Sequence, residues 1–274
     1  MSEGGTLWLV ATPIGNLGDL PQRAVDVLGR VSLVCCEDTR RTGRLLQHAG
    51  VRAERLAVAN EHTEHHRIAD VLDELGAGND VAVVSDAGTP GVSDPGARLV
   101  RAALDAGYAV SAVPGPAAVI TALVVSGLPT DRFVYEGFLP RRGGERAARL
   151  DEIARETRTI VLYEAPHRIE RTLDDLRRVC GDDRSVAICR ELTKLYEEVV
   201  RGTLGTVAIG DPRGEYVIVV GGHRSGSAEP GDDEIRAALR VHLGAGATKR
   251  DAVASVATEL GVPKKQVYAL AIAE

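Results

Sequence analysis

The chain has 274 residues, of which 44% are hydrophobic and 26% are charged, and its formal net charge at pH 7 is −6. This length and composition suffice for one large hydrophobic core or two of medium size, and they are typical of a globular protein. No apolar run approaches the ~20 residues that span a bilayer, and the first five residues lack the basic start and apolar stretch of a signal peptide. We therefore expect a cytoplasmic protein.

The sequence indicates neither a metal site nor a disulfide framework. The cysteines lie in or beside apolar runs and show no Cys-x-x-Cys spacing. Four of the seven histidines fall between His48 and His66, but the glutamates among them are equally well explained as residues that a helix N-terminus favours. The cysteines are Cys35, Cys36, Cys180 and Cys189.

The first half of the chain alternates between short apolar runs and helical patterns. Helical spacing is clearest at Ile68, Val71, Leu72 and Leu75, where the pattern stops at Gly76. Alternation of this kind predicts a mainly parallel sheet with helices packed on it. The apolar runs predict strands at residues 6–11, 31–36, 55–59, 80–85 and 108–113.

A second series of strands follows the turn Pro114-Gly115-Pro116. A helix that begins at Pro166 carries Ile169, Leu173 and Leu176 on one face. We therefore predict two α/β domains, at residues 1–114 and 115–222, with a cleft between them. The strands of the second series are expected at residues 132–135, 159–163, 185–190 and 216–220.

The polar, Gly/Ser-rich segment 223–231 predicts a linker, and residues 232–274 predict a small helical module. Its last two helices, at 248–260 and 263–273, are joined by a tight turn, as in a helix-turn-helix. Basic residues cluster at the ends of these helices, which suits nucleic acid. A helical cap or a dimerisation tail is an equally good interpretation. The basic residues are Lys249, Arg250, Lys264 and Lys265.

Three loops follow predicted strands directly, and we expect them to form one ligand site. The most informative is 85–96, which packs seven Gly, Pro and Asp residues between a strand and a helix that we expect to begin with Asp94 as N-cap. The loops at 12–19 and 114–118 also lie at carboxyl ends of strands, where open α/β sheets bind ligands. Neither a dinucleotide fingerprint nor a P-loop is present.

Five ordered motifs make the chain resemble the tetrapyrrole-methylase superfamily, and within it the branch of 16S rRNA cytidine 2′-O-methyltransferases. The motifs are Leu-Val-Ala-Thr-Pro-Ile-Gly-Asn-Leu-Gly-Asp from residue 9, Cys-Glu-Asp-Thr-Arg from 36, Ser-Asp-Ala-Gly-Thr-Pro from 85, Pro-Gly-Pro from 114 and Tyr-Glu-Ala-Pro-His-Arg from 163. The first loop departs from the Gly-x-Gly-Pro-Gly-Asp of the tetrapyrrole enzymes.

The resemblance implies a homodimer that binds S-adenosylmethionine in the interdomain cleft and methylates a ribose hydroxyl in the decoding region of 16S rRNA, in the small ribosomal subunit. Cofactor contacts are implied from all three loops, and the second domain would close the far side. The implied residues are Pro13, Ser85, Asp86, Gly88, Thr89, Val92, Pro114, Gly115, Ala117, Ala118, Tyr163 and Leu192.

A ribose hydroxyl is a poor nucleophile until its proton is removed, so we expect a catalytic carboxylate near the loops. Glu37, Asp38 and Arg40 follow the second strand directly and are our first choice. The segments 60–62 and 164–168 follow other strands in the same way. Equally, these charges could simply pair with one another or hold a dimer together.

An RNA substrate needs positive charge somewhere on a chain of net charge −6. Arg141, Arg142 and Arg146 form a basic segment after the aromatic residues Phe133, Tyr135 and Phe138, a combination suited to single-stranded RNA. The aromatics are equally well explained as core residues. Lys249, Lys264 and Lys265 complete the expected RNA contacts. Methylation of a small tetrapyrrole-like metabolite and nucleic-acid regulation without catalysis are the alternative functions.

Overall fold

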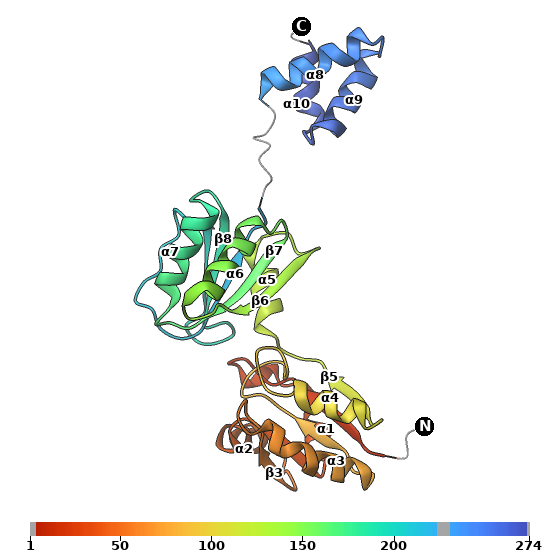
Figure 1. Cartoon of the computed structure of the whole chain (residues 1–274), viewed down its shortest axis with the longest axis vertical. Helices are drawn as coiled ribbons and strands as arrows, with labels where there is room; N and C mark the ends of the chain where they lie inside the picture. Colours follow the sequence, from red (N-terminus) through yellow and green to blue (C-terminus); the bar gives the residue numbers. More distant parts are fainter. Residues whose placement is uncertain (1–3, 224–230, 273–274) are drawn as a thin grey trace. The chain divides into compact units, whose positions relative to one another are not determined.

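Two five-stranded sheets form the body of residues 4–223 in the computed structural model, which describes this range and residues 231–272 (Figure 1). The first sheet is parallel throughout and has the order β3-β2-β4-β1-β5. Because helical connections cover both its faces, its central strands are almost entirely apolar. The strands are β1 (Thr6–Val10), β2 (Leu33–Cys36), β3 (Leu56–Val58), β4 (Val81–Val83) and β5 (Ala109–Val113).

Alternate residues of each strand in this sheet serve two separate cores. In β2, Val34 packs in the core with helices α1 and α2, whereas Leu33 packs in the core with α3 and α4. The sheet is therefore the middle of three layers, and its strand ends remain free to carry loops. The elements are η1 (Leu17–Asp19), α1 (Gln22–Leu28), α2 (Thr39–His48), η2 (Glu64–Arg67), α3 (Ile68–Gly76) and α4 (Ala97–Asp105).

The second sheet is mixed and has the order β6-β7-β10-β8-β9, with only β6 and β7 parallel. Helices α6 and α7 pack on one face, and α5 packs on the other together with Ile14 from the loop after β1. The elements are α5 (Ala118–Ser126), β6 (Phe133–Phe138), α6 (Gly143–Arg155), β7 (Thr159–Glu164), α7 (Ile169–Cys180), β8 (Ser185–Arg190), β9 (Glu198–Thr203) and β10 (Tyr216–Val220).

The predicted fold class and all the predicted strands are confirmed, but β9 was not predicted. Its sequence Glu-Val-Val-Arg-Gly-Thr has little apolar character because it is an edge strand with no buried residue. The boundary at residue 114 stays a prediction, since residues 1–223 form one compact unit and 224–274 a second.

The prediction that Asp94 caps the helix after β4 is wrong. Helix α4 begins only at Ala97, and its N-terminal amides are bound by the Glu64 side chain. One oxygen of this carboxylate accepts hydrogen bonds from the backbone N–H groups of Gly96, Arg98 and Leu99 at 3.0, 2.9 and 3.2 Å. Asp94 is therefore left free for the loop.

The second unit contains three helices packed around Ile235, Leu239, Val256 and Val267. Thr248 caps the middle helix, and the turn at 260–263 leads to the last one. The predicted linker, apart from His223 and Gly231, and the last two residues lie outside the described residues. None of the described helices has the length and hydropathy needed to cross a membrane. The helices are α8 (Asp232–Gly244), α9 (Lys249–Glu259) and α10 (Lys264–Ile272).

Candidate active site

The three predicted ligand loops meet at the carboxyl edge of the first sheet, because β4, β1 and β5 are neighbouring strands. Thr12 and Gly88 exchange two backbone hydrogen bonds of 2.8 and 3.0 Å, which join the loops after β1 and β4. The Thr89 hydroxyl donates to the carbonyl of Pro116 at 3.3 Å and so attaches the loop after β5. Gly88 has a φ of 84°, a conformation that favours glycine.

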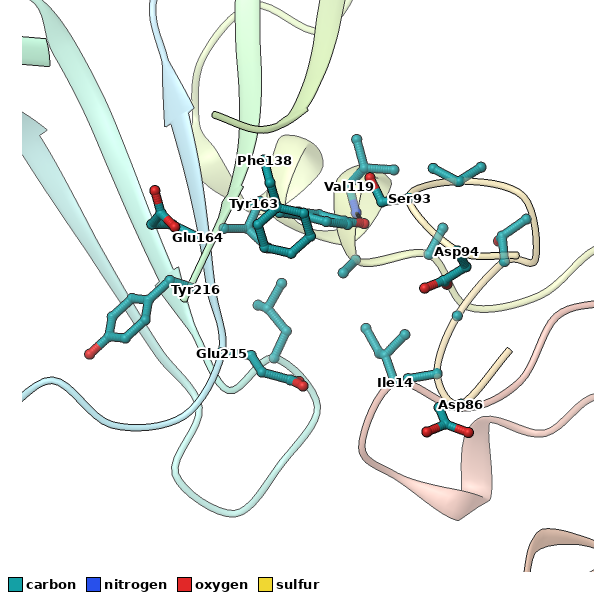
Figure 2. A pocket seen from close by; sticks show the side chains of 18 of the residues that line it. Ile14, Asp86, Ser93, Asp94, Val119, Phe138, Tyr163, Glu164, Glu215 and Tyr216 are labelled. Carbon is teal, nitrogen blue, oxygen red and sulfur yellow. Dashed lines mark hydrogen bonds between the residues drawn. The ribbon is translucent and has the colours of Figure 1, made fainter. Parts of the chain in front are cut away.

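A cleft of about 650 Å³ lies between this edge and the second sheet (Figure 2). It is large enough for a cofactor of nucleoside size. Loop residues form one side, and residues from β7, β10 and the segment after β8 form the other. The implied cofactor residues that line it are Asp86, Gly88, Thr89, Val92, Ala117, Ala118, Tyr163 and Leu192.

Two hydrogen bonds hold the second sheet against the loops. The backbone N–H of Val119 donates to the Tyr163 hydroxyl at 3.0 Å, and the hydroxyls of Ser93 and Tyr135 share a bond of 2.6 Å. The rings of Phe138 and Tyr163 meet edge to face, with centroids 5.7 Å apart (Figure 2). Of these contacts, the bond between Ser93 and Tyr135 joins a loop of the first sheet to the second sheet, and the other two fix Tyr163 within the second half.

Lys194 closes the cleft where the segment after β8 approaches the first loop. Its ammonium group is bound to Glu191 at 2.8 Å and to Glu215 at 2.9 Å. Its side-chain stem lies over Gly15, where a Cβ would come within 2.3 Å of the Lys194 Cγ. Glycine at position 15 thus makes room for this lysine.

Strained backbone flanks the cleft on both sides. Ser93, Glu191 and Thr193 have φ values of 60°, 50° and 66°, which non-glycine residues rarely adopt. Such strain persists only where surrounding contacts impose it, and it is concentrated at ligand sites. Its occurrence on both sides supports a binding function for this cleft.

The cleft is acidic. Five carboxylates and only two cationic side chains line it among the described residues. Burial raises the pKa of Glu37 and Asp86, and burial together with the nearby Glu37 raises the pKa of Asp94 to about 7. The Oδ1 atom of Asp86 is buried without a hydrogen-bond partner among the residues described. The site therefore offers unused negative charge, which suits a cationic ligand such as a sulfonium. The charged residues are Glu37, Asp86, Asp94, Glu164, Glu215, Arg41 and Lys194.

Of the expected catalytic residues, only Glu37 lines the cleft, where it accepts a hydrogen bond of 2.9 Å from the Asp86 backbone N–H. Asp38 and Arg40 line neither the cleft nor the hollow beside it, and their catalytic role stays a prediction. Asp38 caps α2 and binds the Arg40 guanidinium at 2.8 Å, which keeps the pKa of Asp38 below its usual range. The arginine that does reach the cleft is Arg41, 3.4 Å from Asp86.

Four implied cofactor residues lie outside the cleft. Pro13 and Ser85 line a separate hollow of about 300 Å³, which also borders on Asp86. Pro114 and Gly115 line neither cavity, because they fall before the part of the loop that faces the cleft. The cofactor contacts of these four residues stay a prediction.

The basic segment divides into exposed and buried residues. Arg141 and Arg142 are exposed where β6 leads into α6. Arg146 is only 4% exposed, and its guanidinium is bound by Asp175, Thr172 and the carbonyl of Pro140. Arg146 thus holds α6 against α7, and the expectation that it contacts RNA is corrected.

The aromatic residues of this segment also differ in exposure. Phe133 and Tyr135 pack against the core beneath α5, whereas Phe138 is 51% exposed at the cleft. In the second unit, Lys249 donates to the carbonyl of Ala271, and Lys264 and Lys265 are exposed at the start of α10.

The two alternative acidic segments have structural roles. Asn60 organises its own turn by accepting from the N–H groups of His62 and Thr63. Glu164 is buried at the cleft wall, bound to Thr172 at 2.6 Å and to Arg168 at 3.2 Å. Within residues 4–223 and 231–272, no group of three or more side chains is arranged to hold a metal ion.

Several lining residues were missed by the sequence interpretation. Asp94 belongs to the 85–96 loop and was taken for a helix cap, whereas Lys194 and Glu215 lie in segments that carry no motif. The small residues of the loops were the only available signal, and they identify one side of the cleft. The others missed are Ile14, Arg41, Ser93, Val119, Ile120, Phe138, Ala165, Pro166, Tyr216 and Val217.

The chain is a methyltransferase, and it belongs to the tetrapyrrole methylase family. The family model described as Tetrapyrrole (Corrin/Porphyrin) Methylases matches residues 6–208. A curated relative from Synechocystis sp., named ribosomal RNA small subunit methyltransferase I, is 45% identical over 98% of both chains.

Solved structures of the family show the same fold. The methyltransferase CobJ has a TM-score of 0.62 at 21% identity, with 81% of this chain and 97% of that chain covered. Uroporphyrin III C-methyltransferase from Thermus thermophilus, solved as a complex with S-adenyl homocysteine, has a TM-score of 0.54 at 21% identity, with coverage of 80% and 97%.

Proposed function

We propose that this methyltransferase transfers a methyl group from S-adenosylmethionine to the 2′-hydroxyl of a cytidine ribose in the decoding region of 16S rRNA, in the cytoplasm. The observation that carries the proposal is the 45% identity, over 98% of both chains, to a relative named for small-subunit ribosomal RNA methylation. The acidic cleft supports it independently, because its charge suits a sulfonium cofactor.

The cofactor fits the residues that line the cleft. When bound, S-adenosylmethionine supplies an activated methyl group on a cationic sulfur. The unpartnered Oδ1 of Asp86 is available to a cationic centre or a hydroxyl of this molecule. Small residues such as Gly88, Ala117 and Ala118 give a flat ring close access to the backbone. Tyr163 and Leu192 would close the opposite side.

The residues of the cleft mainly have to align the reacting groups and exclude water. Holding two reactants in line can contribute up to ~7–11 kcal/mol of the barrier. The bond from Ser93 to Tyr135 joins the two sides of the cleft, and the bond from Val119 to Tyr163 fixes the tyrosine ring against α5. The chain thus supplies rigid positioning.

One carboxylate must accept the proton of the ribose hydroxyl, and Asp94 suits this role best. Its pKa of about 7 allows it to be ionised and yet basic near neutral pH. Glu37, our first choice from the sequence, already binds the Asp86 N–H. We therefore assign proton acceptance to Asp94, and to Glu37 the positioning of the Asp86 loop.

RNA contacts are proposed outside the cleft on exposed basic residues. Arg141 and Arg142 follow the exposed Phe138 by three and four residues, and the two residue types suit a phosphate and an unstacked base. In the second unit, Lys264 and Lys265 at the start of α10 and Lys249 near its other end would add affinity without base specificity.

A homodimer completes the proposal. Helix α5 has the sequence Ala-Val-Ile-Thr-Ala-Leu-Val-Val-Ser, which is mostly apolar, yet Val124 is 62% exposed and lines neither cavity. A helix of this kind is normally buried on every face. A Val124→Glu variant should therefore sediment as a monomer if α5 forms the interface, and an unchanged dimer would exclude α5 from it.

The function is tested by incubating the protein with methyl-labelled S-adenosylmethionine and either undermethylated 30S subunits or tetrapyrrole precursors. We expect label in 16S rRNA, and nuclease digestion should release it as 2′-O-methylcytidine. Label on a base would overturn the assigned acceptor atom. Label only in a tetrapyrrole would favour the small-molecule alternative, and label in neither substrate would favour a regulator.

A further inference from the structure

The hollow beside the cleft has a composition of its own. Its volume is about 300 Å³, at the lower end of small-molecule sites. Helix α2 forms one wall, and the loops after β1 and β4 form the other. The wall between hollow and cleft is shared, because Arg41 and Asp86 line both.

The charge of the hollow is opposite to that of the cleft. Arg41 and Arg44 line it, and Asp86 is its single carboxylate. The two arginines are three residues apart on α2 and therefore lie on the same face of the helix. Arg41 has a partner in Asp86 at 3.4 Å. Arg44 is exposed and has no carboxylate within 4.0 Å in the part of the chain that the structure describes.

The remaining walls are largely apolar. Pro13, Leu17 and Leu45 line the hollow, and Leu17 is 46% exposed. Arginines beside an apolar surface suit a nucleotide as ligand, because its phosphate is charged and its base and sugar have apolar faces. The carboxylate of a small cofactor would use the arginines and leave the apolar wall uncovered.

We propose that this hollow is an RNA subsite, which seats a nucleotide adjacent to the methylated one and binds its phosphate through Arg44, with Arg41 at the border to the cleft. The subsite rests on the proposed RNA methylation. It also explains why Pro13, in the loop that departs from the tetrapyrrole enzymes, lines the hollow and not the cleft.

The test compares Arg44→Gln with Arg101→Gln in the full-length protein. Arg101 is a matched control, because it is an exposed arginine on α4 and lines neither cavity. Single-turnover methyl transfer is measured against 30S concentration at several salt concentrations, and the cofactor Kd is measured by calorimetry. Arg44→Lys, which keeps the charge but not the guanidinium fork, is the conservative variant.

For Arg44→Gln we expect the half-saturating 30S concentration to rise about tenfold, since one charge-assisted contact is lost. The slope of log affinity against log salt should fall by about 0.7, the value for one phosphate of a single strand. Arg44→Lys should restore the slope and part of the affinity. The cofactor Kd and the rate at saturating 30S should stay at the wild-type values.

Two results would overturn the subsite while leaving the function intact. Arg44→Gln and Arg101→Gln could behave alike with 30S subunits, or Arg44→Gln could raise the cofactor Kd while RNA saturation is unchanged. The second result would assign the hollow to the cofactor. If the wild-type protein transfers no label to RNA under any condition, the proposed function itself fails.

Discussion

The hydroxyl groups of Ser93 and Tyr135 lie 2.6 Å apart, so that the loop after β4 is bonded to the second sheet. Tyr135→Phe removes this bond and frees the loop that carries Val92 and Asp94. A net hydrogen bond contributes about 1 kcal/mol, so we expect the cofactor Kd to rise about fivefold in calorimetry. Tyr268→Phe in α10 is the control, and equal effects of the two variants would refute the role of the bond.

Methyl transfer should depend on the ionisation of Asp94. Its pKa is raised to about 7, first by burial and then by the negative charge of Glu37. A base must be unprotonated to act, so log kcat/KM should rise by about one per pH unit below pH 7 and level off above it. Asp94→Asn should lower kcat at least ~100-fold and abolish this rise of activity with pH. A limb that persists in Asp94→Asn would assign the titration to another group.

Glu37→Gln provides a second test, this time of the effect that Glu37 has on the pKa of Asp94. Removing the negative charge of Glu37 lowers the pKa of Asp94, so the midpoint of the pH profile should move to lower pH. Activity should survive, because Glu37 positions the Asp86 loop and does not accept the proton. Loss of activity as complete as in Asp94→Asn would return the catalytic role to Glu37.

Ionisation of Asp94 also affects folding. Its pKa is raised from 3.8 to about 7 in the native protein. Between these values the native state binds more protons than the unfolded state, so this group makes the free energy of unfolding fall as pH rises from about 4 to 7. Urea unfolding at several pH values should show this contribution as a difference between wild type and Asp94→Asn.

Substitutions of Gly15 and Gly144 should have opposite effects on the stability of the protein, because Lys194 approaches Gly15 closely and nothing approaches Gly144. Gly15→Ala places a methyl group 2.3 Å from the Lys194 Cγ and should cost about 1–3 kcal/mol through overpacking, with weaker cofactor binding. Gly144→Ala in α6 meets no atom within 4 Å and should stabilise the protein by about 0.5–1 kcal/mol. Thermal unfolding and calorimetry measure both variants.

The Glu64 carboxylate binds three backbone N–H groups at the start of α4. Glu64→Ala leaves buried donors without a partner and should destabilise the protein by about 1–3 kcal/mol, which lowers Tm by several degrees. Glu61→Ala, at an exposed position nearby, should leave Tm unchanged. Equal melting temperatures for the two variants would contradict the capping role.

Substitutions of two arginines in the basic segment should have different effects, one on stability and the other on RNA binding. Arg146→Gln breaks buried bonds to Asp175 and Thr172 and should lower the free energy of unfolding by about 2–3 kcal/mol. The loss should be no larger, because Asp175 keeps Arg178 as a partner. Arg142→Gln should leave unfolding unchanged and weaken 30S binding with a smaller salt dependence. The reverse pattern would contradict both assignments.

Much of the fold could be predicted from local pattern. Strands with a near-continuous apolar sequence, such as β2 and β4, are recognisable because both faces are buried. Strand β9 has exposed edge residues and was missed. The start of α4 was misplaced because its capping carboxylate, Glu64, lies 32 residues before Gly96, and no local pattern records such a contact.

The candidate site was predictable only on the side that its loops form. Glycine, proline and aspartate mark the 85–96 loop, which contributes Asp86, Gly88, Thr89 and Val92 to the cleft, whereas Tyr163 and Leu192 on the other side were implied only by the family resemblance. The opposite side is made by Lys194, Glu215 and Val217, whose positions depend on the pairing of β10 with β7 and β8. Arg146 was misassigned because one sequence does not distinguish a buried arginine from an exposed one.

The shared wall formed by Arg41 and Asp86 has a consequence for the order of binding. These side chains lie 3.4 Å apart, with the acidic cleft on one side and the basic hollow on the other. A cation that engages Asp86 would release Arg41 toward a phosphate, and by thermodynamic linkage a phosphate on Arg41 would favour the cation equally. We expect donor and acceptor to bind with positive cooperativity through this one ion pair.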